Sequence, residues 1–228
     1  MKIGLIATGG GGALDAALSL TKLIHPNACL IGFSDRYCGA LEVLQKHCAI
    51  TSLHESTRNE EISDHAYKLF RNNSCDIIVL LYSRLITSRL YDNFSCYNVH
   101  PSLLPDYKGF GALEAAFCDN AKVLGVTIHE VDSSVDAGPI NCQVKTVPTI
   151  KNIKYWQSLS FLMKVILLAS FLDKKLGAKT ESALHTICCT PNLPEVMQLL
   201  GISTSTRIQN GFRDVVSKSE AFSLYSSL

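Results

Sequence analysis

Two polar residues, Asn98 and His100, end an apolar run and are of the types that catalyse reactions at a carbonyl carbon. Residues 98–105 read NVHPSLLP. Side chains two positions apart on a strand point to the same side. An amide donor stabilises a developing oxyanion, and an imidazole transfers a proton. The pair therefore predicts a catalytic site that needs no nucleophilic serine or cysteine.

Asp136 supplies the carboxylate that such a site requires. It opens the loop DAGPI at residues 136–140, 38 positions after Asn98. A carboxylate orients a catalytic imidazole through a hydrogen bond. A lone histidine near a strand end is more often structural, but the segment NVHPSLLP at residues 98–105 together with this loop favours catalysis. The sequence predicts Asn98, His100 and Asp136 as one catalytic group.

A glycine loop, Gly9, Gly10, Gly11 and Gly12, stands between a predicted strand and a predicted helix. Glycines let backbone N–H groups approach an anion at the positive end of a helix, so the loop predicts a phosphate site. It matches neither G-x-G-x-x-G, because Leu14 holds the third glycine position, nor a P-loop. A tight turn without a ligand is the alternative.

Strands and helices alternate along the first 100 residues, which predicts an α/β fold with a mostly parallel, Rossmann-like sheet flanked by helices. Residues after strand ends at one edge of such a sheet form its ligand site. The expected strands are Lys2–Ala7, Ala28–Phe33, Ala49–Ile50, Asp76–Leu81, Ser95–Val99, Val123–Val131 and Ile140–Val147. The expected helices are Ala13–Ile24, Cys38–His47, Glu60–Arg71 and Tyr155–Leu172. The last two strands are expected to be neighbours.

Composition limits the possible partners. Hydrophobic residues make up 47% and charged residues 18% of the 228 residues, and the net charge is +1. The chain is therefore expected to be compact, without a broad field for nucleic acid or a membrane surface. The most apolar stretch, Val165–Leu172, is far shorter than the roughly 20 residues of a membrane span. The N-terminus has no signal-peptide pattern, and a cytoplasmic location is expected.

Nine cysteines, an odd number without a C-x-x-C pair, predict reduced thiols and no metal site. Cys188 and Cys189 are adjacent, and a redox role for them is a minor alternative. The helix Tyr155–Leu172 is apolar on nearly all sides, so it is expected to be buried or to form a homodimer contact. We expect a catalytic domain at residues 1–176 and a C-terminal tail or accessory helical segment at 177–228.

The catalytic motif, the glycine loop and the strand end Gly32-Phe33-Ser34-Asp35 resemble the 10-formyltetrahydrofolate-dependent formyltransferases, above all those that act on glycinamide ribonucleotide. The likeness covers roughly residues 1–150. It implies a Rossmann-like formyltransferase fold and formyl transfer from 10-formyltetrahydrofolate to a primary amine on a small phosphorylated acceptor. It also implies that Asn98, His100 and Asp136 are catalytic.

The resemblance also implies binding residues. Folate contacts are expected from Ser83, Arg84, Leu85 and Ile86, and from the loop that contains Val131 and Asp132. Arg84 is expected near the folate tail. The phosphate of the acceptor is expected at Gly9–Gly12.

The sequence departs from the glycinamide enzymes on the acceptor side. Their loop asparagine is missing, and Leu159–Leu172 contains no acidic residue to match their amine-binding glutamate. A nucleotide-linked amino-sugar N-formyltransferase therefore stays open, as does an inactive folate-binding regulatory protein. A nucleotide-dependent oxidoreductase would use the glycine loop and Asp35, but it leaves the catalytic group without a purpose.

Overall fold

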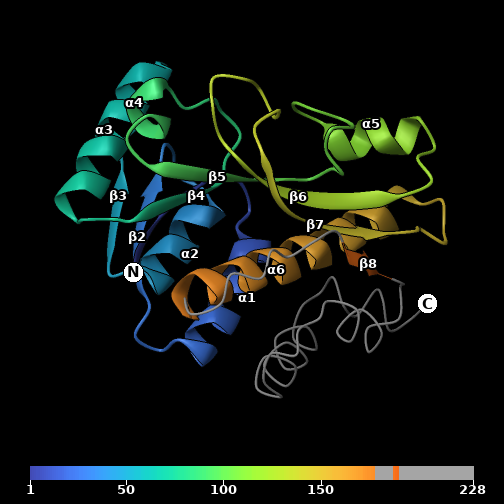
Figure 1. Cartoon of the computed structure of the whole chain (residues 1–228), viewed down its shortest axis with the longest axis horizontal. Coiled ribbons are helices and arrows are strands. Elements are labelled where there is room, and N and C mark those ends of the chain that lie inside the picture. Colours follow the sequence, from blue (N-terminus) through green and yellow to red (C-terminus); the bar gives the residue numbers. More distant parts are fainter. Residues whose placement is uncertain (178–186, 190–228) are drawn as a thin grey trace.

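The computed structural model describes residues 1–177 and 187–189, which form one eight-stranded sheet with helices on both faces (Figure 1). The strand order is β3-β2-β1-β4-β5-β6-β7-β8. The first five strands are parallel: β1 (Lys2–Ala7), β2 (Cys29–Ser34), β3 (Ile50–Leu53), β4 (Ile77–Leu81) and β5 (Ser95–His100). The connecting helices are α1 (Gly12–Ile24), α2 (Gly39–His47) and α3 (Asn59–Asn72). The predicted mostly parallel α/β sheet is confirmed.

Strands β1, β2 and β4 are buried on both faces, which explains their nearly continuous apolar sequences. In β1, Ile3 and Leu5 face one hydrophobic core, and Ile6 faces the other. The first core also contains apolar residues of α1, α2 and α6, and the second contains those of α3 and α4 (Ser88–Tyr91). Figure 1 shows α3 and α4 on one side of the sheet and α1 and α6 on the other.

The remaining strands extend the sheet past β5. Strand β6 (Leu124–Glu130) is antiparallel to β5, and β7 (Ile140–Thr146) is antiparallel to β6, so the expected pairing of these two is confirmed. A strand β8 (Ile187–Cys189) pairs parallel with β7. It falls in the segment expected as an accessory helical tail, which therefore contributes an edge strand to the sheet.

Helix α6 (Ile153–Gly177) crosses this extended part of the sheet and packs on α1, β6 and β7. At 25 residues and a mean hydropathy of 1.4 it is long and apolar enough to span a membrane, but 72% of its most apolar window is buried inside the protein. The expected burial of this helix is confirmed. The apolar side chains of this helix are mostly covered within the chain itself. A homodimer contact through residues 155–172 stays a prediction.

Most of the predicted C-terminal segment lies outside the residues that the structure describes. The backbone of Cys188 and Cys189 belongs to β8, but their side chains are outside the described residues. The other residues of the predicted segment 177–228, apart from Gly177 and β8, are outside them as well. The predicted boundary at residue 176 is thus untested.

Candidate active site

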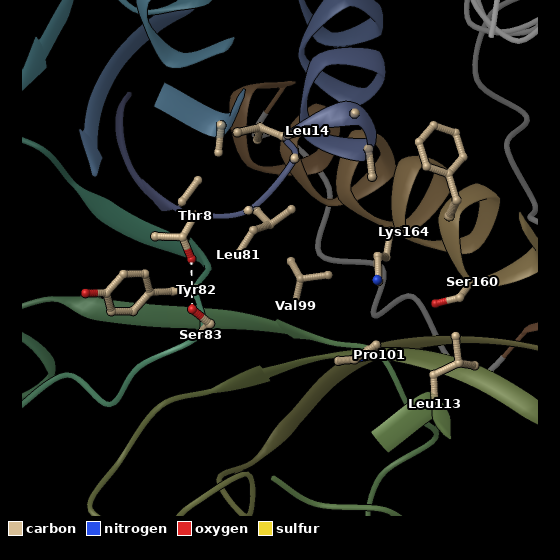
Figure 2. Close-up of a pocket in the computed structure, with 18 of the residues that line it drawn as sticks. Thr8, Leu14, Leu81, Tyr82, Ser83, Val99, Pro101, Leu113, Ser160 and Lys164 are labelled. Atoms are coloured by element: carbon tan, nitrogen blue, oxygen red, sulfur yellow. Dashed lines mark hydrogen bonds between the residues drawn. The ribbon is translucent and has the colours of Figure 1, made fainter. Parts of the chain in front are cut away.

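The candidate site lies next to the point where the strand order of the sheet reverses, between β1 and β4. Strand β1 has β2 on one side and β4 on the other, and open α/β sheets bind ligands beyond the carboxyl ends of such strands. The loop after β1 holds the glycines, and the loop after β4 holds residues 82–87. The Thr8 amide donates to the Leu81 carbonyl at 3.0 Å, and the hydroxyls of Thr8 and Ser83 are 3.1 Å apart (Figure 2).

Asp136 is the centre of the predicted catalytic group. Its Oδ2 accepts a hydrogen bond from the Gly109 amide at 2.8 Å and lies 3.3 Å from His100 Nδ1. Its Oδ1 lies 3.5 Å from Asn98 Nδ2 and 3.4 Å from His129 Nε2. The structure therefore brings Asn98, His100 and Asp136 together, although they come from β5 and from the loop after β6.

The carboxylate of Asp136 is held in its charged form. Its pKa is lowered to about 2, chiefly because His129 donates a hydrogen bond to it, with further contributions from the Gly109 amide and from the charge of His100. These outweigh the opposing effect of burial. The backbone φ of Asp136 is +46°, a left-handed conformation that aspartate tolerates better than most residues.

The imidazole of His100 lies between two acceptors. Its Nε2 is 2.8 Å from the Tyr107 carbonyl, opposite the nitrogen that faces Asp136. A carbonyl and a carboxylate accept hydrogen bonds only, so each ring nitrogen faces an acceptor. The side chain is 4% exposed, which keeps water from competing for these bonds.

A fourth polar residue, His129, completes the group and was not among the predicted site residues. It stands opposite Asn98 in the antiparallel pairing of β5 with β6. Its Nδ1 donates to the Glu130 carbonyl at 2.9 Å, and its Nε2 lies 3.4 Å from Asp136 Oδ1 and 3.4 Å from Asn98 Nδ2. The available signal was the alternation of Thr127 and His129 in an otherwise apolar strand, which places two polar side chains on one face.

Thr127 fixes the loop that carries Tyr107. Its hydroxyl donates to the Ser102 carbonyl at 2.8 Å and accepts from the Leu104 amide at 3.0 Å and from Gln143 Nε2 at 2.9 Å. The residue is fully buried, so these bonds are formed without competition from water. Thr127 thus holds the backbone against which His100 is oriented.

A cavity of about 300 Å³ opens beside the catalytic group. All six residues expected to contact folate line it, together with Asn98, His100, His129 and Asp136: they are Ser83, Arg84, Leu85, Ile86, Val131 and Asp132. Asp132 accepts hydrogen bonds from the amide and the hydroxyl of Ser134, which shapes the loop at the cavity wall and lowers the pKa of Asp132.

Arg84 is engaged within the protein. Its guanidinium donates to Asp35 at 3.0 Å and to the carbonyls of Ser56 at 2.7 Å and Thr57 at 2.8 Å. Burial acts to raise the pKa of Asp35, but hydrogen bonds from Arg36, Tyr82 and Arg84 outweigh it and hold that pKa below its usual range. Asp35 therefore anchors the loop after β4. It has no free side for a nucleotide ribose, the role that the oxidoreductase alternative required.

A larger cavity of about 570 Å³ adjoins the first and shares Tyr82, Ser83, Val99 and Pro101 with it. All four glycines of the loop line this larger cavity. No side chain caps α1, so the first N–H groups of this helix are available to an anion. The predicted phosphate loop is thus placed at a cavity next to the catalytic group.

The glycines also serve the fold, as the turn alternative supposed. Gly11 has a φ of +78°, and a Cβ there would lie 2.8 Å from the Ala40 backbone. The Gly9 carbonyl accepts from the Ala40 amide at 2.9 Å. Gly10 is different, because a Cβ at this position meets no atom within 4 Å.

Helix α6 forms the far wall of the larger cavity through Gln157, Ser160, Phe161 and Lys164. Figure 2 shows the Lys164 ammonium and the Ser160 hydroxyl beside the cavity, with Thr8 across from them. Lys164 was not among the predicted site residues. The signal was its place in the sequence, since it is the one charged residue between Tyr155 and Leu172. Glu114 of α5 (Ala112–Cys118) also lines this cavity.

Within residues 1–177 and 187–189, no group of three His, Cys, Asp or Glu side chains could hold a metal ion.

Fold and site define a class of protein: an α/β enzyme with two adjoining cavities and an Asn-His-Asp group in the wall of the smaller one. The sequence pattern of the formyl transferase family matches residues 1–154, and the chain belongs to that family. Formyl transferases of this family use 10-formyltetrahydrofolate as the formyl donor.

Two relatives illustrate the sequence similarity. A stretch of 103 residues is 37% identical to the methionyl-tRNA formyltransferase of Fervidobacterium nodosum and covers 45% of this chain and 32% of that protein. Another, of 76 residues, is 41% identical to the phosphoribosylglycinamide formyltransferase of Bacillus subtilis and covers 32% of this chain and 39% of that protein. Each match thus spans less than half of the relative's length.

The fold matches a solved structure over a longer range. The phosphoribosylglycinamide formyltransferase from Bacillus halodurans superposes with a TM-score of 0.72 at 24% identity, over 80% of this chain and 99% of that one. At this identity the match shows the fold, and the predicted formyltransferase architecture is confirmed.

Proposed function

We propose that this protein transfers a formyl group from 10-formyltetrahydrofolate to the primary amine of a small phosphorylated acceptor in the cytoplasm. The observation that carries the proposal is the Asp136 carboxylate, which lies within 3.5 Å of Asn98, His100 and His129 in the wall of the smaller cavity. Such a group suits a reaction in which charge develops on a carbonyl oxygen and a proton changes place.

The smaller cavity fits the donor. Leu85, Ile86 and Val131 offer apolar contacts to a flat ring system, while the catalytic group lies at the inner end. Arg84 lines this cavity, but its bonds to Asp35 and to two carbonyls give it a further role in holding the loop. We assign the donor's formyl carbon to the side that faces Asn98 and His100.

The larger cavity fits the acceptor. Its glycine loop would hold the phosphate through backbone N–H groups at the start of α1, and the amine would approach past Val99 and Pro101, which both cavities share. This route brings an amine to the formyl carbon without passing through the protein core.

The reaction follows from these positions. The amine nitrogen bonds to the formyl carbon, Asn98 donates a hydrogen bond to the oxygen as it becomes negative, and protonated His100 stabilises this oxygen through its charge. The bond between that carbon and N10 of the donor then breaks. The proton that the amine gives up reaches N10 by way of Asp136, through a water molecule. His129 keeps Asp136 charged and oriented.

A panel assay tests the proposal. Purified full-length protein is incubated with 10-formyltetrahydrofolate and one amine at a time: glycinamide ribonucleotide, a nucleotide-linked amino sugar or methionyl-tRNA. We expect formyl transfer to a phosphorylated small molecule and none to tRNA, because the net charge of +1 offers no broad surface for a polyanion. The His100→Ala variant is the matched control.

The remaining outcomes are also informative. Transfer to methionyl-tRNA would overturn the small-acceptor proposal and would follow the similarity to the Fervidobacterium nodosum enzyme. Folate binding without transfer to any amine would identify an inactive binding protein instead.

A further inference from the structure

Helix α6 is largely apolar between Tyr155 and Leu172, but three of its polar or charged side chains, Gln157, Ser160 and Lys164, line the larger cavity. Ser160 and Lys164 are four residues apart, so they lie on the same face of the helix. Both line the cavity, and Figure 2 shows both polar atoms beside it. One face of α6 thus brings a hydroxyl and an ammonium to the same cavity.

Neither side chain has a partner in the part of the chain that the structure describes. Ser160 is 1% exposed, and its Oγ has no hydrogen bond. Lys164 forms no salt bridge within 4.0 Å, and the one charge that acts on it is that of Glu114. Burial of Lys164 lowers its pKa, which reports the cost of keeping this ammonium away from water.

Ser160 is buried and Lys164 is partly buried, and polar groups removed from water without a partner are costly, so a site that keeps these two together has a use for them. A hydroxyl and an ammonium are both hydrogen-bond donors, and together they suit the oxygens of an anion. The wall around them includes the apolar side chains of Val99 and Leu113.

We propose that Lys164 and Ser160 bind a second anionic group of the acceptor, in addition to the phosphate held by the glycine loop. This inference rests on the proposed function and names the acceptor class: an amine that carries a phosphate and also a carboxylate or a further phosphoryl group. The two anion sites are separate, because Thr8, next to the loop, lies across the cavity from Lys164 (Figure 2).

The test compares acceptors that differ in the second anionic group. One pair is O-phosphoserine and 2-aminoethyl phosphate, which differ by a carboxylate. The other is a nucleoside-diphosphate-linked amino sugar and the corresponding amino-sugar 1-phosphate, which differ by a nucleotidyl phosphoryl group. For at least one pair we expect kcat/KM to be at least tenfold higher for the member with the second anionic group. A response in the first pair identifies this group as a carboxylate, and a response in the second pair identifies it as a phosphoryl group.

Variants at Lys164 make the test specific. Lys164→Met is expected to lower kcat/KM for the preferred member at least tenfold, mainly through KM, and to leave the single-anion member within twofold. Lys164→Arg should restore part of the loss. The control is Lys154→Met, which removes an exposed lysine from the same helix. Melting temperatures of both variants check that the fold is retained.

The outcomes separate this inference from the proposed function. Transfer to amines without preference in either pair, or an equal effect of Lys164→Met on both members, overturns the inference and leaves formyl transfer intact. If no amine is formylated, the proposed function fails, and calorimetry with pyrophosphate decides the inference. Binding at least tenfold weaker in Lys164→Met than in Lys154→Met supports it. Equal binding, or none to the wild type, overturns it.

Discussion

At the scale of single residues, the site depends on one carboxylate with several donors. Asn98→Ala, His100→Ala and Asp136→Ala should each reduce formyl transfer on the order of a hundred- to a thousandfold, since each removes a group that stabilises the developing charge or carries the proton. Steady-state kinetics with 10-formyltetrahydrofolate at neutral pH measure this, and melting temperatures check the fold. Near-wild-type turnover in His100→Ala would contradict the mechanism.

The lowered pKa of Asp136 has a consequence for stability. Its folded value of about 2 lies below the usual value of about 3.9, so the carboxylate stabilises the protein above pH 4 and this contribution is lost as the pH falls toward 2. The difference in unfolding free energy between wild type and Asp136→Asn should therefore shrink by about 2 kcal/mol between pH 6 and pH 2. Denaturant titrations at several pH values measure it, with Asp92→Asn, at an exposed carboxylate, as control. A difference independent of pH would show that Asp136 is not held charged.

Gly10 allows the phosphate loop to be tested apart from the fold. A side chain at Gly10 has space, whereas one at Gly11 would collide with the Ala40 backbone. Gly10→Val should raise the acceptor KM at least tenfold by occupying the anion's position, with the donor KM within twofold and an unchanged melting temperature. Equal changes in both KM values would indicate a turn without a ligand.

The grouping of Asn98, His100 and Asp136 was predictable because the types of these residues and their positions after predicted strands can be read from the sequence. His129 and Lys164 were not, since their roles depend on neighbours. His129 becomes part of the site only through a register that places it opposite Asn98. Lys164 does so only because α6 turns that face toward the glycine loop.

At the scale of elements, the loop between β6 and β7 determines where Asp136 lies. Gly138 is packed so closely against the Glu130 carbonyl that any side chain there would overlap it, and the Glu130 amide donates to the Pro139 carbonyl at 2.8 Å. Gly138→Ala should therefore shift the loop and reduce kcat about a hundredfold, as a misplaced catalytic group does. The exposed neighbour Ala137, changed to serine, is the control. An active Gly138→Ala enzyme would mean that the loop adjusts without moving Asp136.

The long elements were predictable from apolar runs and helical spacing, but the short ones were not. Helix α4 has four residues and α5 has seven, too few to show a period. Strand β8 has three residues and is defined by its pairing with β7, which is a tertiary contact. The sequence indicated that β6 and β7 pair, but not that β6 joins the parallel strands by pairing antiparallel with β5.

At the scale of the whole molecule, a single helix belongs both to the hydrophobic core and to the wall of the larger cavity. One part of α6 fills the first core, where Phe171 is fully buried and its ring centroid lies 5.0 Å from that of Tyr97. Another part forms the wall of the larger cavity. Two phenylalanines of the same helix thus have different surroundings: Phe171 in the core, and partly buried Phe161 at the cavity, next to Gly12.

These surroundings predict that the same substitution affects mainly stability at Phe171 and mainly the acceptor KM at Phe161. Phe171→Ala should lower the free energy of unfolding by about 3–5 kcal/mol because it leaves a cavity in the core, with little change in the acceptor KM of the folded enzyme. Phe161→Ala should cost only about 1–2 kcal/mol, since the ring is partly buried, but should raise the acceptor KM severalfold by widening the cavity beside the glycine loop. Denaturant unfolding and steady-state kinetics on both variants measure the two effects. If both variants lost stability equally and neither changed the acceptor KM, the larger cavity would not be the acceptor site.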